Sequence, residues 1–174
     1  DWRRRQAADR TIVRRPDLLS RANILPYLSC GFYVTLLSAP EVSLEELERI
    51  CTVSGAYGAK KVLVVTSLQK SVATGLSMVK RFPSLENAMS WIEKSEKKVP
   101  YVVGVAEAPR SGVHWLELKR RVLERDLPLS LVFCADELFA KEASHFDTMM
   151  CLDERGSKIP LSCEVSVALD RLFG

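Results

Sequence analysis

The closing stretch SCEVSVALDRLFG (Ser162–Gly174) is the part of this chain on which its fold depends. With the residue before it, the stretch carries apolar residues at helical spacing in one stripe, made by Leu161, Val165, Ala168 and Leu172. Three further apolar positions widen this stripe beyond the arc that one core-facing surface normally covers, namely Val167, Leu169 and Phe173. The pattern predicts a helix over 161–173 that is buried on more than one side.

The residues before this helix alternate between strand and helix patterns. Apolar runs rich in β-branched residues predict buried strands over 31–37, 62–67, 127–133 and 148–152, and a further strand with its loop over 101–109. Helices are expected from Ser43, over a polar stretch that ends at Lys80, from Ser84, and over 114–125 and 136–143. This order predicts an α/β fold with a mainly parallel sheet flanked by helices.

The helix patterns also identify the residues expected to face the core. For the helix capped by Ser43 they are Leu44, Leu47, Ile50 and Cys51. For the helix that follows Ser84 they are Leu85, Ala88, Met89 and Ile92. For the helix over 114–125 they are Trp115, Leu118, Val122 and Leu123.

Length and composition predict one globular domain over 31–174, preceded by an extension over 1–30. The chain has 174 residues, of which 47% are hydrophobic, and no apolar run approaches the length of a membrane-spanning helix. Its five cysteines form no C-x-x-C pair and are odd in number, so neither a zinc site nor a closed disulfide framework is indicated. We therefore expect no metal and a reducing, intracellular compartment.

The excess positive charge lies in the first segment. Residues 1–22 hold seven arginines and three aspartates, whereas the whole chain has a net charge of only +3. One interpretation is a solvated or partner-bound tail of low order. The other is an arm that binds RNA phosphates through Arg3, Arg4, Arg5, Arg14 and Arg15. Arginine bias is also typical of transit sequences, so we expect a mitochondrial or cytoplasmic location, with the mitochondrion preferred.

Several classes of site are disfavoured. No glycine-rich phosphate-binding motif and no G-x-S-x-G turn is present. His114 and His145 are far apart and lack metal-ligand spacing, so both are interpreted as helix-end or surface residues. Parallel sheets bind ligands at the carboxyl ends of their strands. Here those ends lead into the charged segments AEAPRSG, CADELF and DERGSKIPLS.

The order of these motifs resembles the SPOUT superfamily of knotted RNA methyltransferases. SCEVSVA, from Ser162, is similar to the SLNVSVA motif of its ribose 2'-O-methylating branch. LDRLFG, TLLSAP and YGAKKVLVVT resemble LDRLLG, ALLHYP and YGVKGYYIVT of a bacterial branch. The resemblance covers residues 31–174.

The resemblance implies a trefoil-knotted domain that binds S-adenosylmethionine and dimerises through its last helix, with itself or with a related chain. It places the cofactor pocket on three loops that contain Val105, Ala106, Glu107, Cys134, Ala135, Asp136, Glu137, Leu152, Ile159, Leu161 and Ser162. It also implies RNA, ribosomal or transfer RNA, as the partner. Part of the apolar closing helix would then pack on the sheet and part on a second subunit.

Three departures from the family pattern affect the expected chemistry. Where the ribose-methylating branch has an arginine six residues before the glycine matched by Gly58, this chain has Thr52, which cannot supply a permanent positive charge. Arg49, one turn earlier on the same helix face, is the candidate substitute. The loop from Cys134 to Leu138 lacks the family's glycines, which let the backbone approach the cofactor.

The third departure is Glu164, which replaces an asparagine of the family motif. A carboxylate can only accept hydrogen bonds and repels phosphate, whereas an acid in the first turn of a helix is mildly stabilising. Ser162 and Glu164 are thus candidate catalytic residues, but the structural interpretation of Glu164 is favoured over the catalytic one. In the same way, Asp136 is either a ribose ligand or the cap of the helix after it.

Three functional hypotheses follow. The first is a catalytically degenerate homologue that binds RNA as an assembly factor in ribosome maturation, with S-adenosylmethionine binding either retained or lost. The second is an active S-adenosylmethionine-dependent ribose 2'-O-methyltransferase that uses Arg49 or an arginine from a partner subunit. The third is a structural subunit that binds protein and does not contact RNA.

Overall fold

The computed structural model describes residues 2–37, 42–66, 76–106, 112–134, 142–152 and 159–174. Its α-helices are α1 (Trp2–Arg14), α2 (Leu44–Ala56), α3 (Leu85–Glu96), α4 (Trp115–Arg125) and α6 (Leu161–Phe173). Its strands are β1 (Phe32–Leu37), β2 (Lys61–Val65), β3 (Val79–Phe82), β4 (Tyr101–Ala106), β5 (Leu129–Cys134) and β6 (Thr148–Cys151). Short 3-10 helices are η1 (Pro16–Arg21), η2 (Leu25–Tyr27) and η3 (Ala143–His145).

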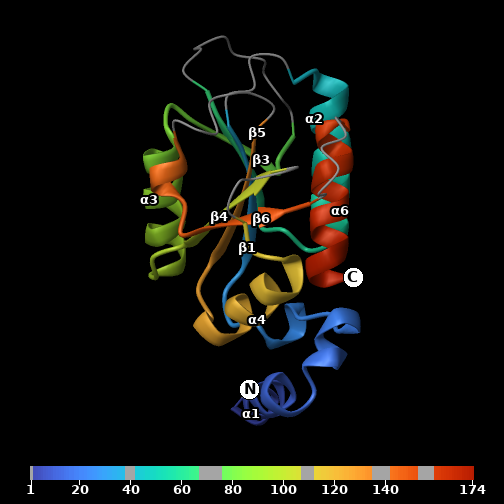
Figure 1. The fold of residues 1–174 in the computed structure, drawn as a ribbon. Helices are drawn as coiled ribbons and strands as arrows, with labels where there is room; N and C mark the ends of the chain where they lie inside the picture. Colours follow the sequence, from blue (N-terminus) through green and yellow to red (C-terminus); the bar gives the residue numbers. More distant parts are fainter. Residues whose placement is uncertain (1, 38–41, 67–75, 107–111, 135–141, 153–158) are drawn as a thin grey trace.

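The strands form one six-stranded sheet in the order β3-β2-β1-β5-β4-β6, and every pairing in it is parallel. The predicted α/β class with a parallel sheet is therefore confirmed. Helices α2 and α6 cover one face and α3 covers the other (Figure 1). One hydrophobic cluster lies on the α2, α4 and α6 side and a second on the α3 side.

Strand β3 corrects the expected helical stretch up to Lys80. The segment 79–82 pairs with β2 in parallel, with Val62 opposite Val79. It has four residues, two of them charged and exposed, and it has a neighbouring strand on one side only. Such a short edge strand carries a weak local signal, because its conformation is set by pairing with a strand distant in sequence. The predicted helix over 136–143 lies almost entirely outside the described residues, and Ala143 begins η3.

The predicted helix caps are confirmed. The Ser43 hydroxyl accepts a hydrogen bond from the Glu46 backbone N–H, and the Ser84 hydroxyl accepts one from Asn87. Most predicted core residues of these helices are buried, but Leu44 is 47% exposed. It lies in the first turn, at the edge of the arc formed by its buried neighbours, so its predicted inward orientation is wrong.

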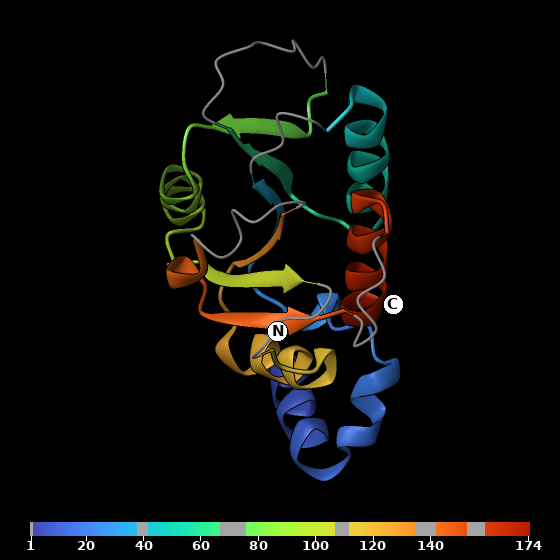
Figure 2. The ribbon, with the colours of Figure 1, turned by 45° about the horizontal axis from the view of Figure 1, so that its top comes forward.

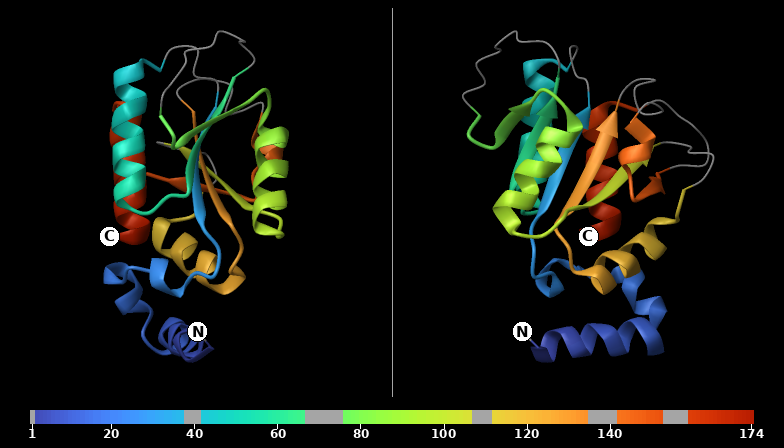
Figure 3. Two further views of the ribbon diagram at one scale, coloured as in Figure 1. Left: turned by 180° about the vertical axis from the view of Figure 1, so that it is seen from behind. Right: turned by 90° about the vertical axis from the view of Figure 1, so that its left-hand side faces the viewer.

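The described part of the extension contains α1, η1 and η2 joined by short non-helical segments, in place of the expected tail of low order. Leu19 and Ile24 are buried in the hydrophobic cluster on the α2 side. Residues of α1 and η1 contact α4, and the segment leads directly into β1. Figure 3 shows α1 at the end of the molecule away from which β1 and β5 point. The domain boundary at residue 30 stays a prediction.

Helix α6 has the predicted bounds. Five of its apolar side chains are buried within the chain, namely Val165, Ala168, Leu169, Leu172 and Phe173. The Phe173 ring packs against the Phe32 ring with centroids 4.5 Å apart. Because α6 packs on α2, α4 and β5 together, one subunit already covers most of its wide apolar stripe. Val167 is the exception, at 36% exposed.

Candidate functional site

The carboxyl ends of three strands bring part of the predicted cofactor site together. Leu152, just after β6, donates its backbone N–H to the Ala106 carbonyl at the end of β4, at 3.0 Å. Val105 is opposite Phe133 in the sheet, next to Cys134. Val105 and Leu152 are buried, and Ala106 is half-buried. These residues form an apolar edge suited to the apolar part of a cofactor.

The two faces of the sheet divide the predicted residues, however. Val105 and Leu152 belong to the cluster on the α2 and α6 side, whereas Cys134 packs against the cluster on the α3 side. Successive side chains of a strand point to opposite faces, which explains the division. Glu107, Ala135, Asp136, Glu137 and Leu138 lie outside the described residues, so their predicted roles stay predictions.

The start of α6 is held by a residue that the sequence did not indicate. The Ser162 backbone N–H donates to Oε1 of Glu46 in α2, at 2.8 Å. The first N–H groups of a helix have no partner within the helix, and the helix dipole favours a negative charge there. Glu46 therefore caps α6 from a different helix. An acid in the first turn of α2 gave no signal for this contact, because its partner is 116 positions away.

The remaining candidates near this helix start have ordinary structural environments. Leu161 is half-buried and packs on the core, while Ile159 is 38% exposed. Glu164 is buried at 8% exposure in the first turn of α6, and its backbone N–H donates to the Pro160 carbonyl at 3.1 Å. This position agrees with the structural interpretation, in which the helix dipole stabilises a carboxylate near the helix N-terminus.

The candidate catalytic arginine is paired with acids of its own helix. Arg49 forms ion pairs with Glu45 and, at 3.7 Å, with Glu46. Thr52, at the position of the family arginine, donates its hydroxyl to the Glu48 carbonyl at 2.8 Å. Arg49 and Ser162 are thus linked through Glu46, but the positive charge of Arg49 is already balanced by carboxylates.

The opposite end of α6 is also anchored. Tyr57, which caps α2, donates its hydroxyl to Oδ1 of Asp170 at 3.1 Å. Burial, and then this hydrogen bond, raise the pKa of Tyr57 above its ordinary value. Arg171 donates to the Leu152 carbonyl at the end of β6. The LDRLFG ending therefore has a structural role, since its polar residues attach α6 to α2 and β6.

Helices α2 and α6 consequently lie side by side and run in the same direction. Glu46 contacts the beginning of α6, and Tyr57 contacts its last turn. Figure 2 shows the two helices along one side of the molecule. The pairing fixes the start of α6 beside the start of α2, on the side toward which β1 points.

The predicted RNA-binding arginines lie at the other end of the molecule. Arg3 and Arg14 are exposed on α1, as is Arg10, which the sequence analysis did not include. Arg15 pairs with Asp17 at 2.8 Å. Arg4 and Arg5 belong to α1, but their side chains are outside the description.

Other site classes find no support among the described residues. His114 caps α4 by accepting from the Leu116 N–H at 3.3 Å, and exposed His145 lies 3.2 Å from Glu142, as expected for helix-end and surface residues. Within the described ranges, no three His, Cys, Asp or Glu side chains are grouped to hold a metal ion. None of the described helices combines the length and apolar character needed to cross a membrane. All five cysteines are free thiols.

Comparison with known proteins identifies the fold. No family model and no curated protein matches the sequence. The SpoU methyltransferase AviRb from Streptomyces viridochromogenes has a similar structure, with a TM-score of 0.64 and 16% identity over 87% of this chain and 63% of AviRb. AviRb in complex with the cofactor AdoMet gives a TM-score of 0.62 and 17% identity, over 87% of this chain and 61% of that one.

The TrmH/SpoU tRNA modifying enzyme of A. aeolicus matches 95% of this chain and 82% of its own, with a TM-score of 0.62 and 9% identity. The chain thus has the fold of SpoU-type RNA methyltransferases, and the fold resemblance inferred from the sequence is confirmed. It spans less than two thirds of the AviRb structures.

Proposed function

We propose that this chain is a SpoU-type RNA-methyltransferase homologue that binds RNA as an assembly factor in ribosome or ribosomal-RNA maturation, with a degenerate catalytic centre. The SpoU fold and the exposed arginines of α1 support RNA as the partner. The proposal places the chain in a reducing compartment, mitochondrial or cytoplasmic, in keeping with its free thiols.

The observation that carries the degenerate centre is the state of Arg49. Activation of a ribose hydroxyl needs a positive charge that is available to the substrate, because such a charge lowers the pKa of the hydroxyl. Arg49 is instead held between Glu45 and Glu46, and Thr52 supplies no charge. The surroundings of these residues therefore disfavour hydroxyl activation by this helix.

Cofactor binding is treated separately from catalysis. S-adenosylmethionine, when bound, would supply the methyl group. Among the described residues, half-buried Ala106 and Leu161 offer apolar surface to it, whereas Val105 and Leu152 are buried beneath them in the core. The backbone N–H of Ser162 already donates to Glu46 and is not available to a ligand carboxylate in this arrangement. We therefore expect weak cofactor binding.

The proposal includes a dimer through α6 and a knotted C-terminal region. Val167 and Cys163 are exposed on α6 and would contact the second subunit. This apolar surface is small, since the other apolar residues of α6 are buried in their own subunit.

Three measurements on the purified chain test the proposal. Calorimetry with S-adenosylmethionine is expected to give weak or undetectable binding, and transfer of labelled methyl groups to cellular RNA is expected to be absent. Direct titration with ribosomal-RNA fragments is expected to show salt-sensitive binding. Methyl transfer that is lost in Arg49→Ala would instead support the active enzyme. Absence of any RNA binding would refute the proposal.

A further inference from the structure

We infer that one face of α1, formed by Arg3, Arg10 and Arg14, is a phosphate-binding stripe that anchors RNA at the end of the molecule opposite the carboxyl ends of β1 and β5. The inference rests on the proposed RNA-binding function. It adds which side chains bind the RNA phosphates and where on the molecule they lie. We call these three residues the arginine stripe.

The spacing of the three arginines places them on one side of the helix. Arg3 and Arg10 are seven residues apart, and Arg14 follows four residues later, which corresponds to two turns and one turn. All three side chains are exposed. At a rise of about 1.5 Å per residue the stripe is roughly 17 Å long. A strand of nucleic acid presents a phosphate about every 3.4 Å along its axis, so several phosphates would lie beside the stripe.

The stripe differs from nearby arginines in its counter-charges. Over the part of the chain that the structure describes, no carboxylate pairs with Arg3, Arg10 or Arg14. Arg10 does donate to the neutral side chain of Gln6, at 3.2 Å. Arg15, by contrast, donates from two nitrogens to Asp17. The stripe therefore offers positive charge that no acid of the described chain offsets.

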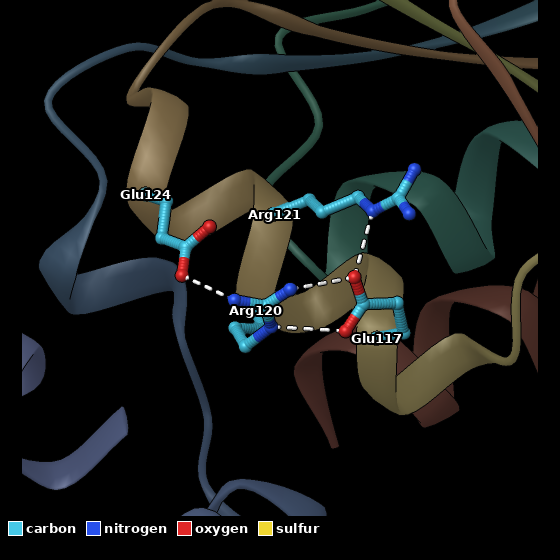
Figure 4. A network of polar contacts seen from close by, with 4 residues as sticks. All are labelled: Glu117, Arg120, Arg121 and Glu124. Atoms are coloured by element: carbon cyan, nitrogen blue, oxygen red, sulfur yellow. Dashed lines mark hydrogen bonds and ion pairs between the residues drawn. The ribbon is translucent and has the colours of Figure 1, made fainter. Parts of the chain in front are cut away.

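The arginines of α4, the helix that α1 contacts, are also committed. Arg120 donates to both Glu117 and Glu124, and Arg121 donates to Glu117 (Figure 4). These pairs engage Arg120 and Arg121 with acids of their own helix, and Arg125 lies over the Tyr101 ring. The stripe differs from Arg120 and Arg121 in that its guanidinium groups are not held by acids of the described chain.

The position of α1 determines what the stripe can do. The extension leads into the amino end of β1, whereas the predicted cofactor residues follow the carboxyl ends of β4, β5 and β6. A six-residue strand such as β1 is about 20 Å long. A phosphate bound to the stripe therefore cannot belong to a nucleotide held at the carboxyl end of the sheet in the same subunit. The stripe acts as an anchor for a distant part of the RNA.

RNA fits this surface better than other anionic partners. Each guanidinium can bind a phosphate through two parallel hydrogen bonds. Helical spacing places the small residue Ala7 between Arg3 and Arg10, so this face presents a continuous row of cations that matches the repeated phosphates of an RNA strand.

Two variants separate the stripe from its surroundings. Arg3→Gln/Arg10→Gln/Arg14→Gln removes the stripe, and Arg14→Gln can be compared with Arg15→Gln, which removes the same charge from the adjacent, Asp17-paired position. Affinity for a ribosomal-RNA fragment is measured by fluorescence anisotropy between 50 and 300 mM salt. Circular dichroism checks that each variant retains its helices.

The triple variant is expected to bind RNA roughly tenfold more weakly, uniformly across sequences, with a salt slope reduced by about 2. Arg14→Gln should weaken binding by several-fold, whereas Arg15→Gln should stay within about twofold of the unmodified chain. Unchanged affinity and slope in the triple variant, with RNA still bound by the unmodified chain, would overturn this inference alone. Tighter binding of the unmodified chain to anionic lipid vesicles or polyglutamate than to RNA would also overturn it. No RNA binding by the unmodified chain refutes the proposed function as well.

Discussion

Lys119 is fully buried on α4, where most side chains of this type would be exposed. Over the described residues its Nζ has no hydrogen-bond partner, and it lies 5.9 Å from the centroid of the Trp115 ring. Burial lowers the pKa of Lys119, and the charge of Asp170 opposes this shift only in part. A buried ammonium group without a hydrogen bond destabilises the folded state.

Replacing this lysine should therefore stabilise the protein. Lys119→Met keeps a long side chain and removes the amine, so we expect the free energy of unfolding at pH 7 to rise by about 1–3 kcal/mol. The pKa is lower in the folded state, so the unmodified chain gains stability as pH rises from the lowered pKa toward the unfolded value of about 10.4. The advantage of the variant should shrink over that range. Urea unfolding from pH 7 to 10 measures this, and a variant whose advantage is the same at every pH, or that is less stable than the unmodified chain, would contradict it.

Glu117 differs from Lys119 because the folded state favours its charged form. Hydrogen bonds from Arg120, and then from Arg121, lower the pKa of Glu117 to about 2. Its contribution is therefore present above the unfolded pKa of about 4.3 and is lost as pH falls toward 2. Because these side chains are about a third exposed, Glu117→Gln should cost less than about 1 kcal/mol at pH 7. The difference should vanish near pH 2 in urea titrations. Glu124→Gln removes the pair with Arg120 and leaves both contacts of Glu117 intact, so it should cost less, and a larger loss there would argue against the network.

At the scale of elements, the pairing of α2 with α6 organises the candidate site. Two hydrogen bonds connect these helices. Glu46 in the first turn of α2 accepts one from the Ser162 N–H at the start of α6, and Tyr57 at the end of α2 donates one to Asp170 in the last turn of α6. The helix start that carries Leu161 and Ser162 is therefore positioned by a carboxylate of another helix. Helix propensity alone could not fix this arrangement.

Two adjacent acids of α2 provide a matched test. Both pair with Arg49, but of the two only Glu46 accepts a hydrogen bond from α6 among the described residues. Glu46→Ala should lower the free energy of unfolding by about 1–2 kcal/mol and speed hydrogen exchange of the Ser162 amide. Glu45→Ala should change stability by less than about 0.5 kcal/mol. Glu46→Gln keeps an acceptor oxygen and should recover much of the loss. Equal effects of the two alanine variants would show that the contact with α6 is unimportant.

For the whole molecule, the arginine stripe and the carboxyl ends of the strands lie at opposite ends. We expect the two to be separable. Glu46→Ala should leave the salt slope of RNA binding unchanged, because the contact between Glu46 and Ser162 is far from α1. The triple stripe variant should keep its melting temperature within about 2 °C, since its exposed side chains contribute little to folding. A change in the salt slope in Glu46→Ala would indicate coupling between the two ends.

The sequence by itself determined the α/β class, the bounds of α6, the caps of α2 and α3, and the likeness to the SPOUT fold. These features arise from signals in the sequence itself, such as apolar periodicity, capping hydroxyls and the order of short motifs. The sequence also indicated an arginine-rich segment that binds RNA. It could not show that Arg15 pairs with Asp17, or that Arg10 shares a helix face with Arg3 and Arg14.

Tertiary structure decided the features that depend on contacts between distant residues. Strand β3 forms because β2 pairs with it, Cys134 faces away from Val105 and Leu152, and Glu46 reaches Ser162 across 116 positions. Tertiary structure likewise buried Lys119 without a hydrogen bond among the described residues, whereas the pairing of Arg49 with Glu45 and Glu46 follows from their spacing on one helix. A side chain's available charge depends on what surrounds it in three dimensions, and local sequence patterns do not contain that information.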